Sequence, residues 1–189
     1  MVFIDGTNLD RTCREKFFRN DIDFARFLAA LSHGTRLLQT YYVTAPYKRD
    51  INPDWYNIQI GTINVLRTMP NTTVSLQQHR MRTTICKKCK FPNTAPKEKG
   101  TDVAVAAYLV EAAVNRAADR LILVANDSDY GPVFQMAKKY GRHAVLAFVL
   151  GPAEADTAVR LGLAPLSHEA KSLIRLNQEF MATCWRARR

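Results

Sequence analysis

The sequence has 189 residues, of which 47% are hydrophobic and 23% charged. This composition suits one globular domain with a buried core and argues against a disordered chain. Lys and Arg number 27 against 17 Asp and Glu, a net charge of +10. Such a charge predicts a polyanionic partner, with nucleic acid as the first candidate. It also fits a generally basic, well-solvated surface.

The chain is expected to be soluble and cytoplasmic. Its opening apolar run, Met1–Ile4, is interrupted at once by Asp5, unlike a secretory signal. No apolar run reaches the roughly 18 residues that a membrane span needs. Disulfides are not expected in that compartment, although four cysteines are present: Cys13, Cys86, Cys89 and Cys184.

The first half of the chain alternates between strands and helices. Apolar residues at helical spacing predict the helices, and short apolar or β-branched runs predict the strands. The polar residues Asp5-Gly6-Thr7-Asn8 are expected to form a loop after the first strand. In chain order we expect a strand at 1–4, a helix at 21–31, a strand at 37–44, a helix at 55–69 and a strand at 72–78.

The second half begins with a basic segment at 79–100, which we interpret as an extended loop or a hairpin. The helix that follows is apolar almost all round, so it should be central, with Thr101 or Asp102 as its cap. The next strand is a continuous apolar run, which is typical of a strand covered on both faces. We expect a helix at 101–115, a strand at 120–125, a helix at 130–140, a strand at 143–150 and a helical segment at 153–189 with a basic end.

This alternation predicts an α/β fold. Its architecture should be a Rossmann-like, three-layer α/β/α sandwich with a mainly parallel central sheet. Residues 1–151 should form the domain, with 79–100 as an insertion. Residues 152–189 should be a helical extension packed on that same domain.

Several aspartates follow predicted strands at one edge of this sheet. Asp5 follows the first strand, Asp127 and Asp129 follow the strand at 120–125, and Asp102 begins the helix that leads into it. Ligands bind outside the carboxyl ends of parallel strands. Clustered carboxylates stay ionised only if a cation offsets them, and hard oxygen ligands select Mg²⁺ or Mn²⁺. Each aspartate alone could equally be a turn or helix cap.

Neutral side chains beside these acids could support the site. Asn8 and Ser128 could add oxygens or orient the acids. Tyr130 could stack on a base or pack in the core. Histidine-based chemistry is disfavoured, because His33, His79, His143 and His168 are scattered outside these segments.

Three segments resemble the motifs of one family. They are Phe3-Ile4-Asp5-Gly6-Thr7-Asn8, Glu98-Lys99-Gly100-Thr101-Asp102-Val103 and Asn126-Asp127-Ser128-Asp129-Tyr130. In order and in flanking elements they resemble the NYN domain, a PIN-like nuclease family, over about residues 1–150. The resemblance implies a PIN-like sandwich, metal-dependent ribonuclease activity and Mg²⁺ or Mn²⁺ as cofactor. It also implies that Asp5, Asp102, Asp127 and Asp129 form the acidic site, with Asn8 in support.

Basic residues would have to bring a nucleic-acid strand to these acids. The segment at 79–100 is the expected guide, through contacts to phosphate that do not depend on sequence. Lys99 could contact phosphate or pair with an acid. The candidate residues are Arg80, Arg82, Lys87, Lys88, Lys90, Lys97 and Lys99.

Cys86-Lys87-Lys88-Cys89 is half of a zinc knuckle. Cys13, Cys184 and His79 are candidate partners without the usual spacing, and a site shared across a dimer is another route. Two free thiols in a basic loop are the alternative. Redox chemistry is disfavoured, because the pair does not open a helix after a strand.

The leading interpretation is a metal-dependent endoribonuclease acting on single-stranded RNA. A non-catalytic or regulatory RNA-binding module is the alternative. An aspartyl phosphatase is disfavoured, because Gly6 and Thr7 follow Asp5 where an Asp-x-Asp would be needed. A homodimer, an antitoxin and other protein partners stay open.

Overall fold

Six strands form one parallel central sheet in a computed structural model that describes residues 1–156 and 162–187. Their order is β3-β2-β1-β6-β7-β8, and each neighbouring pair is parallel. The expectation of a mainly parallel sheet is therefore confirmed. The strands are β1 (Val2–Asp5), β2 (Thr40–Thr44), β3 (Thr72–Leu76), β6 (Arg120–Val124), β7 (His143–Val149) and β8 (Ser172–Leu176).

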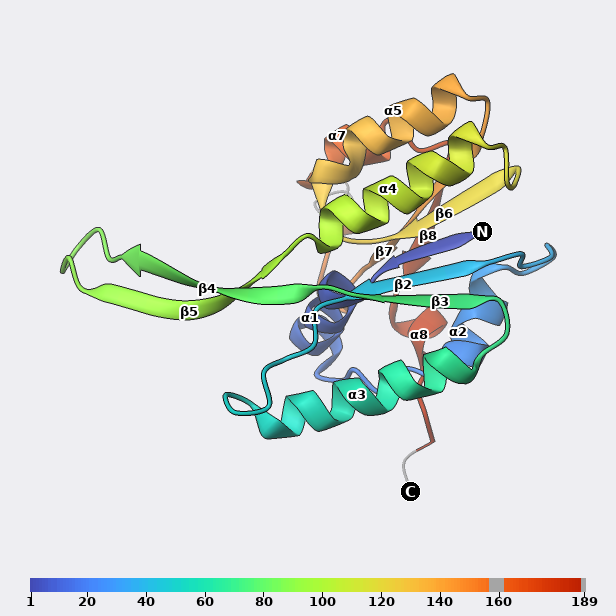
Figure 1. Cartoon of the computed structure of the whole chain (residues 1–189). Helices are drawn as coiled ribbons and strands as arrows, with labels where there is room; N and C mark the ends of the chain where they lie inside the picture. The colour runs from blue at the N-terminus through green and yellow to red at the C-terminus, as the bar shows by residue number, and fades with distance from the viewer. Residues whose placement is uncertain (157–161, 188–189) are drawn as a thin grey trace.

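Helices cover both faces of this sheet, which gives the three-layer α/β/α sandwich (Figure 1). One face carries α1 (Gly6–Phe17), α2 (Phe24–Leu31), α3 (Pro53–Thr68) and α8 (Gln178–Ala182). The other face carries α4 (Thr101–Val114), α5 (Gly131–Lys139) and α7 (Ala164–Ser167). A short 3-10 helix, η1 (Ser128–Tyr130), precedes α5.

Side chains of the central strands alternate between the two faces, as the pleat of a strand requires. Val2 and Ile4 of β1 pack with the first set of helices, whereas Phe3 between them packs with the second. All three are fully buried. Continuous apolar runs therefore serve both cores at once, which is why their strands were predictable.

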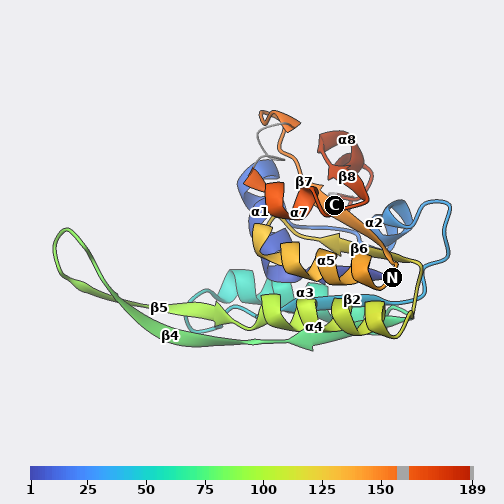
Figure 2. The ribbon, with the colours of Figure 1, turned by 90° about the horizontal axis from the view of Figure 1, so that it is seen from above.

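The basic segment forms an antiparallel hairpin of β4 (Gln78–Ile85) and β5 (Pro92–Lys99). This confirms a hairpin, one of the two predicted forms. We call residues 78–99 the arm, because they project from one end of the sandwich beyond the sheet and the helices (Figures 1 and 2). The arm leads directly into α4 through Gly100, whose φ of +99° is easily adopted only by glycine.

The predicted loop after the first strand is wrong, because α1 begins at Gly6 directly after β1. The carboxylate of Asp5 caps the helix by accepting a hydrogen bond from the backbone N–H of Asn8. Leu9, Thr12 and Cys13 then face the core. The residues Gly6-Thr7-Asn8 favour turns in isolation, and the cap together with this buried face overrides that preference.

The predicted helical C-terminal segment is also wrong in part. Its middle forms β8, which pairs with β7 from Ser172 to Leu176 and extends the sheet by one strand. Leu176 is fully buried there. The helices α7 and α8 flank this strand. Of the predicted basic end, Arg186 is exposed, while Arg188 and Arg189 lie outside the described residues.

The apolar sequence of α4 predicted a central helix, and this prediction is wrong. The helix lies on the outside of the sandwich, and the Val103 side chain is 73% exposed. Neither Thr101 nor Asp102 caps it, because the cap position is Gly100 and no side chain bonds there. No helix in the described part of the chain is long and apolar enough to span a membrane.

Candidate metal centre

The site lies where the order of the strands reverses, between β1 and β6. From β1 the chain builds outward through β2 and β3, and from β6 it builds the other way through β7 and β8. Loops that leave the carboxyl ends of two such neighbouring strands diverge and open a crevice between them. Asp5 ends β1, and Asn126 and Asp127 follow β6, so the topology places these residues at that crevice.

A pocket of about 360 Å³ occupies this position. It combines residues from β1 and α1, from the base of the arm, from the start of α4 and from the turn after β6. Its lining residues are Asp5, Thr7, Asn8, Arg11, Lys97, Glu98, Gly100, Asp102 and Asp127.

Asp5 is the most constrained acid of the pocket, with only 2% of its surface exposed. Its Oδ1 accepts a hydrogen bond from the Asn8 backbone N–H at 2.9 Å, and its Oδ2 accepts one from the Tyr130 hydroxyl at 2.9 Å. Burial raises the pKa of Asp5 to about 7. The two hydrogen bonds oppose this shift, while the charges of Glu98 and Asp102 add to it.

Two asparagine side chains, Asn8 and Asn126, fix the far side of the pocket. The Asn8 Oδ1 accepts a hydrogen bond from the backbone N–H of Asn126 at 2.8 Å. The Asn126 side chain in turn donates to the carbonyl of Val149 at 2.9 Å and accepts from its N–H at 2.7 Å. Asn8 thus ties α1 to the turn that carries Asp127.

The carboxylates of the pocket repel one another. Loss of solvent raises the pKa of Asp102 first, and the charges of Glu98, Asp127 and Asp129 raise it further. Asp127 also caps η1, because its Oδ1 accepts a hydrogen bond from the Asp129 N–H at 3.0 Å. A cation in the pocket would offset this repulsion.

Comparisons with known proteins agree with this architecture. The family model of the NYN domain matches residues 1–164. The chain belongs to the NYN domain family. A crystal structure of a protein of unknown function from Vibrio parahaemolyticus has the same fold, with a TM-score of 0.64 and 20% identity over 94% of this chain and 92% of that one. The search of curated proteins gives no match.

Membership of the NYN family makes the sandwich a PIN-like, nuclease-type domain. The matched range contains all three of its acidic segments and the arm. It also extends past the expected domain boundary at residue 151, into the segment that precedes β8.

The NYN-type pocket does not include every predicted site residue. Asp129 and Ser128 are not among its lining residues, although the charge of Asp129 still raises the pKa of Asp102. Of the two alternatives for Tyr130, stacking on a base or packing in the core, the structure shows core packing, because the residue is buried with 2% exposure. Its hydroxyl orients Asp5.

Three pocket residues were missed by the motif analysis. Glu98 belongs to the second motif but entered only as a flank of Asp102, although its charge acts on both Asp5 and Asp102. Arg11 and Thr7 line the pocket because α1 begins immediately after Asp5. The spacing from Asp5 to Arg11 places both residues at the pocket only if a helix begins directly after Asp5, and that helix was not predicted.

The donor chemistry of the pocket fits a hard divalent cation such as Mg²⁺ or Mn²⁺, since its acids offer only oxygen atoms. Within the described residues, however, no three carboxylate, thiol or imidazole groups are grouped closely enough to hold one ion. Direct coordination of one ion by three of these carboxylates would therefore require them to stand closer together than they do here.

The predicted basic guide residues are all exposed on the arm: Arg80, Arg82, Lys87, Lys88, Lys90, Lys97 and Lys99. Lys97 also lines the pocket. Among the described residues, no ion pair joins Lys99 to an acid within 4 Å, so the pairing alternative is not the one observed.

Two of the scattered histidines have structural partners. His79 Nδ1 lies 3.0 Å from the Pro46 carbonyl at the base of the arm. His143 Nε2 lies 2.7 Å from the Ser172 hydroxyl and links β7 to β8. Neither lines the acidic pocket.

Replacing Asp5 by Asn should stabilise the metal-free protein, and more so at pH 8 than at pH 5. The folded pKa lies near 7, above the ordinary value of 3.8, so the folded state binds the proton more tightly. The contribution of Asp5 to stability is then largest below pH 3.8 and is lost as the pH rises through 7, by an amount on the order of a few kcal/mol. The oxygen of an Asn side chain can keep the cap, and its amide N–H can donate to the Tyr130 hydroxyl oxygen, but the side chain does not titrate. Urea unfolding with chelator at both pH values measures the difference; an equal effect at both would contradict the raised pKa.

Proposed function

We propose that this chain is a divalent-metal-dependent endoribonuclease that hydrolyses phosphodiester bonds of single-stranded RNA. One observation carries the proposal: acids from three separate segments line one pocket at the point where the strand order of the sheet reverses. These acids are Asp5, Asp102 and Asp127. Membership of the NYN family, a nuclease-type domain, supports the same function.

Asp5, Asp102 and Asp127 would hold Mg²⁺ or Mn²⁺, and Glu98 and Asp129 would add negative charge around them. Such an ion, when bound, polarises the phosphoryl oxygen and lowers the pKa of a bound water. The contacts with Tyr130 and the Asn8 N–H keep both oxygens of Asp5 in place. Asp102, with fewer contacts, is free to orient a water or to accept its proton.

A phosphate group would otherwise be repelled by these acids. Lys97 and Arg11 line the same pocket and supply positive charge beside it. Arg11 also lines an adjoining open pocket of about 680 Å³ between α1 and the segment after β7. A strand that follows the arm toward Lys97 can therefore continue past Arg11, so the enzyme needs no free RNA end.

Replacing Lys87, Lys88 and Lys90 by Gln should weaken RNA binding and its salt dependence. For single-stranded RNA, removing one phosphate contact should lower the slope of log affinity against log salt by about 0.7. The matched control replaces the exposed Lys138, Lys139 and Lys171, which lie away from the pocket and the arm, and removes the same charge. Fluorescence anisotropy at several salt concentrations measures both. Equal slopes for the two triple variants would contradict a guiding role for the arm.

A non-catalytic RNA-binding module is the second candidate. The separation of the pocket acids favours it, since no three of them are grouped closely enough for one ion within the described residues. In that case the exposed basic arm would still bind RNA, but no bond would be cut.

Circular single-stranded RNA separates the two candidates, because it has no ends for an exonuclease. Purified protein would be incubated with it in Mn²⁺, in Mg²⁺ and in chelator. We expect linear products with either ion and none with chelator. Intact circles that are nonetheless bound would favour the binding module, and cleavage that persists in chelator would contradict the metal dependence.

A further inference from the structure

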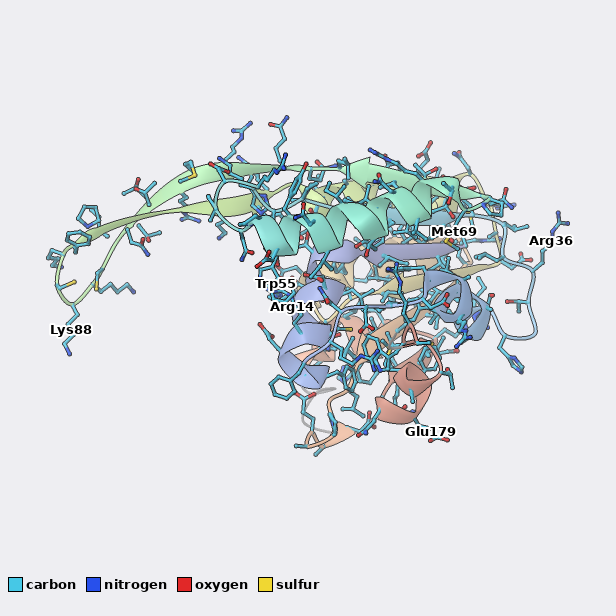
Figure 3. The ribbon with its side chains drawn as sticks, turned by 90° about the horizontal axis from the view of Figure 1, so that it is seen from below. Arg14, Arg36, Trp55, Met69, Lys88 and Glu179 are labelled. Atoms are coloured by element: carbon cyan, nitrogen blue, oxygen red, sulfur yellow. The ribbon has the colours of Figure 1, made fainter. Side chains whose placement is uncertain are left out.

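The end of the arm carries two exposed cysteines, Cys86 and Cys89. They flank a tight turn at the far end of the hairpin, where Lys88 lies farthest from the body (Figure 3). The Cys86 N–H donates to the Phe91 carbonyl at 3.0 Å, and the Lys90 N–H donates to the Cys86 carbonyl at 2.9 Å. These bonds close the turn, so both thiols are held at its rim.

The turn also places the two sulfur atoms close in sequence, because Cys86 and Cys89 are separated by only two residues and both are exposed. Two thiolates from a Cys-x-x-Cys turn supply half of a tetrahedral sulfur site.

No second half lies within the described residues of this chain. The candidate partners Cys13 and Cys184 are buried in the core of the body with no exposed surface. The third candidate, His79, pairs in register with Glu98 at the base of the arm and contacts the Pro46 carbonyl. No group of three His, Cys, Asp or Glu side chains suited to one metal ion occurs among the described residues.

We propose that Cys86 and Cys89 of two copies of this chain together bind one Zn²⁺ ion, which joins the two arms end to end. A two-fold axis through the ion brings the same turn from each copy and supplies four sulfur ligands, as structural zinc requires. The arm stands clear of the sheet and helices in both views (Figures 1 and 2), so two turns can meet without contact between the bodies.

Charge favours this arrangement only when the ion is present. Each turn carries Lys87, Lys88 and Lys90, all exposed, so two empty turns repel each other. A Zn²⁺ ion with four thiolates has a net charge of −2, which these lysines surround and offset. Thiolate ligands in tetrahedral geometry select zinc over magnesium or calcium. The predicted dimer should therefore depend on zinc.

The test uses the full chain, reduced and freed of metal, and Zn²⁺ alone as the probe. Light scattering measures the mass as zinc is added, and metal analysis measures the ions bound. We expect a dimer with one zinc ion per two chains, returned to monomer by chelator. Co²⁺ in place of zinc should give the intense absorption of four thiolates around cobalt, to which the acidic pocket cannot contribute.

The variant Cys86→Ser with Cys89→Ser should stay monomeric and lose the cobalt absorption. Its thermal unfolding should be unchanged, because both thiols are exposed. Thr84→Ala on the same arm, which changes no thiol, should behave as wild type. A wild-type monomer that absorbs as a thiolate complex, a dimer that persists in the double cysteine variant, or the absence of thiolate absorption would each overturn the proposal.

Discussion

Asp102→Asn should lower the rate of RNA cleavage by about 100-fold or more, since loss of several kcal/mol of charge stabilisation corresponds to that factor. Asp102 lines the pocket. Loss of solvent raises the pKa of its carboxyl first, and the charges of Glu98, Asp127 and Asp129 raise it further. The substitution keeps the shape of the side chain and removes its charge. Single-turnover cleavage of labelled RNA in Mn²⁺ measures the loss.

The control for this variant is Asp50→Asn, which removes the same charge from an exposed position before α3. It should cleave as wild type. Asp102→Asn should also unfold at the same temperature as wild type or a higher one, because one repulsive carboxylate has gone. Equal cleavage rates for the two variants would show that Asp102 serves only as part of the first turn of α4.

Gly6→Ala should destabilise the protein by about 1–3 kcal/mol, as overpacking of a core does. A Cβ atom at Gly6 would lie 2.4 Å from Cζ and 2.7 Å from the hydroxyl oxygen of Tyr42. That ring is buried, with 3% exposure, and packs edge to face on Phe24 at 5.5 Å. The substitution therefore requires the buried Tyr42 ring or the start of α1 to shift.

Gly61→Ala is the matched control, because a Cβ atom at Gly61 meets nothing within 4 Å. It lies in the interior of α3, where alanine should stabilise by about 0.5–1 kcal/mol. Thermal unfolding should therefore shift in opposite directions for the two variants, by roughly 2–4 °C per kcal/mol. A shift upward at both glycines would contradict the close contact with Tyr42.

The strands at the centre of the sheet were predictable because burial on both faces leaves a continuous apolar run, as in β6 and β7. Prediction of secondary structure failed where contacts with distant parts of the chain determine it. Gly6, Thr7 and Asn8 are helical because Asp5 caps them and Leu9 has a core to enter. The five residues of β8 form a strand because the edge of β7 is there to pair with them.

The candidate site was predictable to the extent that it depends on sheet topology. Strand ends placed Asp5 and Asp127 at one edge, and the motif resemblance added Asp102. Identifying Glu98 as a pocket residue required the register of the hairpin, which sets β5 beside the pocket. Identifying the contact between Tyr130 and Asp5 required knowing that Tyr130 is buried, because the sequence alone does not distinguish an exposed tyrosine from a core tyrosine.

Binding of Mn²⁺ to the acidic pocket tests the central claim most directly. The signal of free Mn²⁺ in electron paramagnetic resonance would be followed during titration of wild type and of Asp5→Asn with Asp127→Asn. We predict that wild type depletes the signal at about pH 8, that the double variant leaves it, and that Asp50→Asn behaves as wild type. Equal depletion by wild type and the double variant would show that these aspartates do not form the metal site.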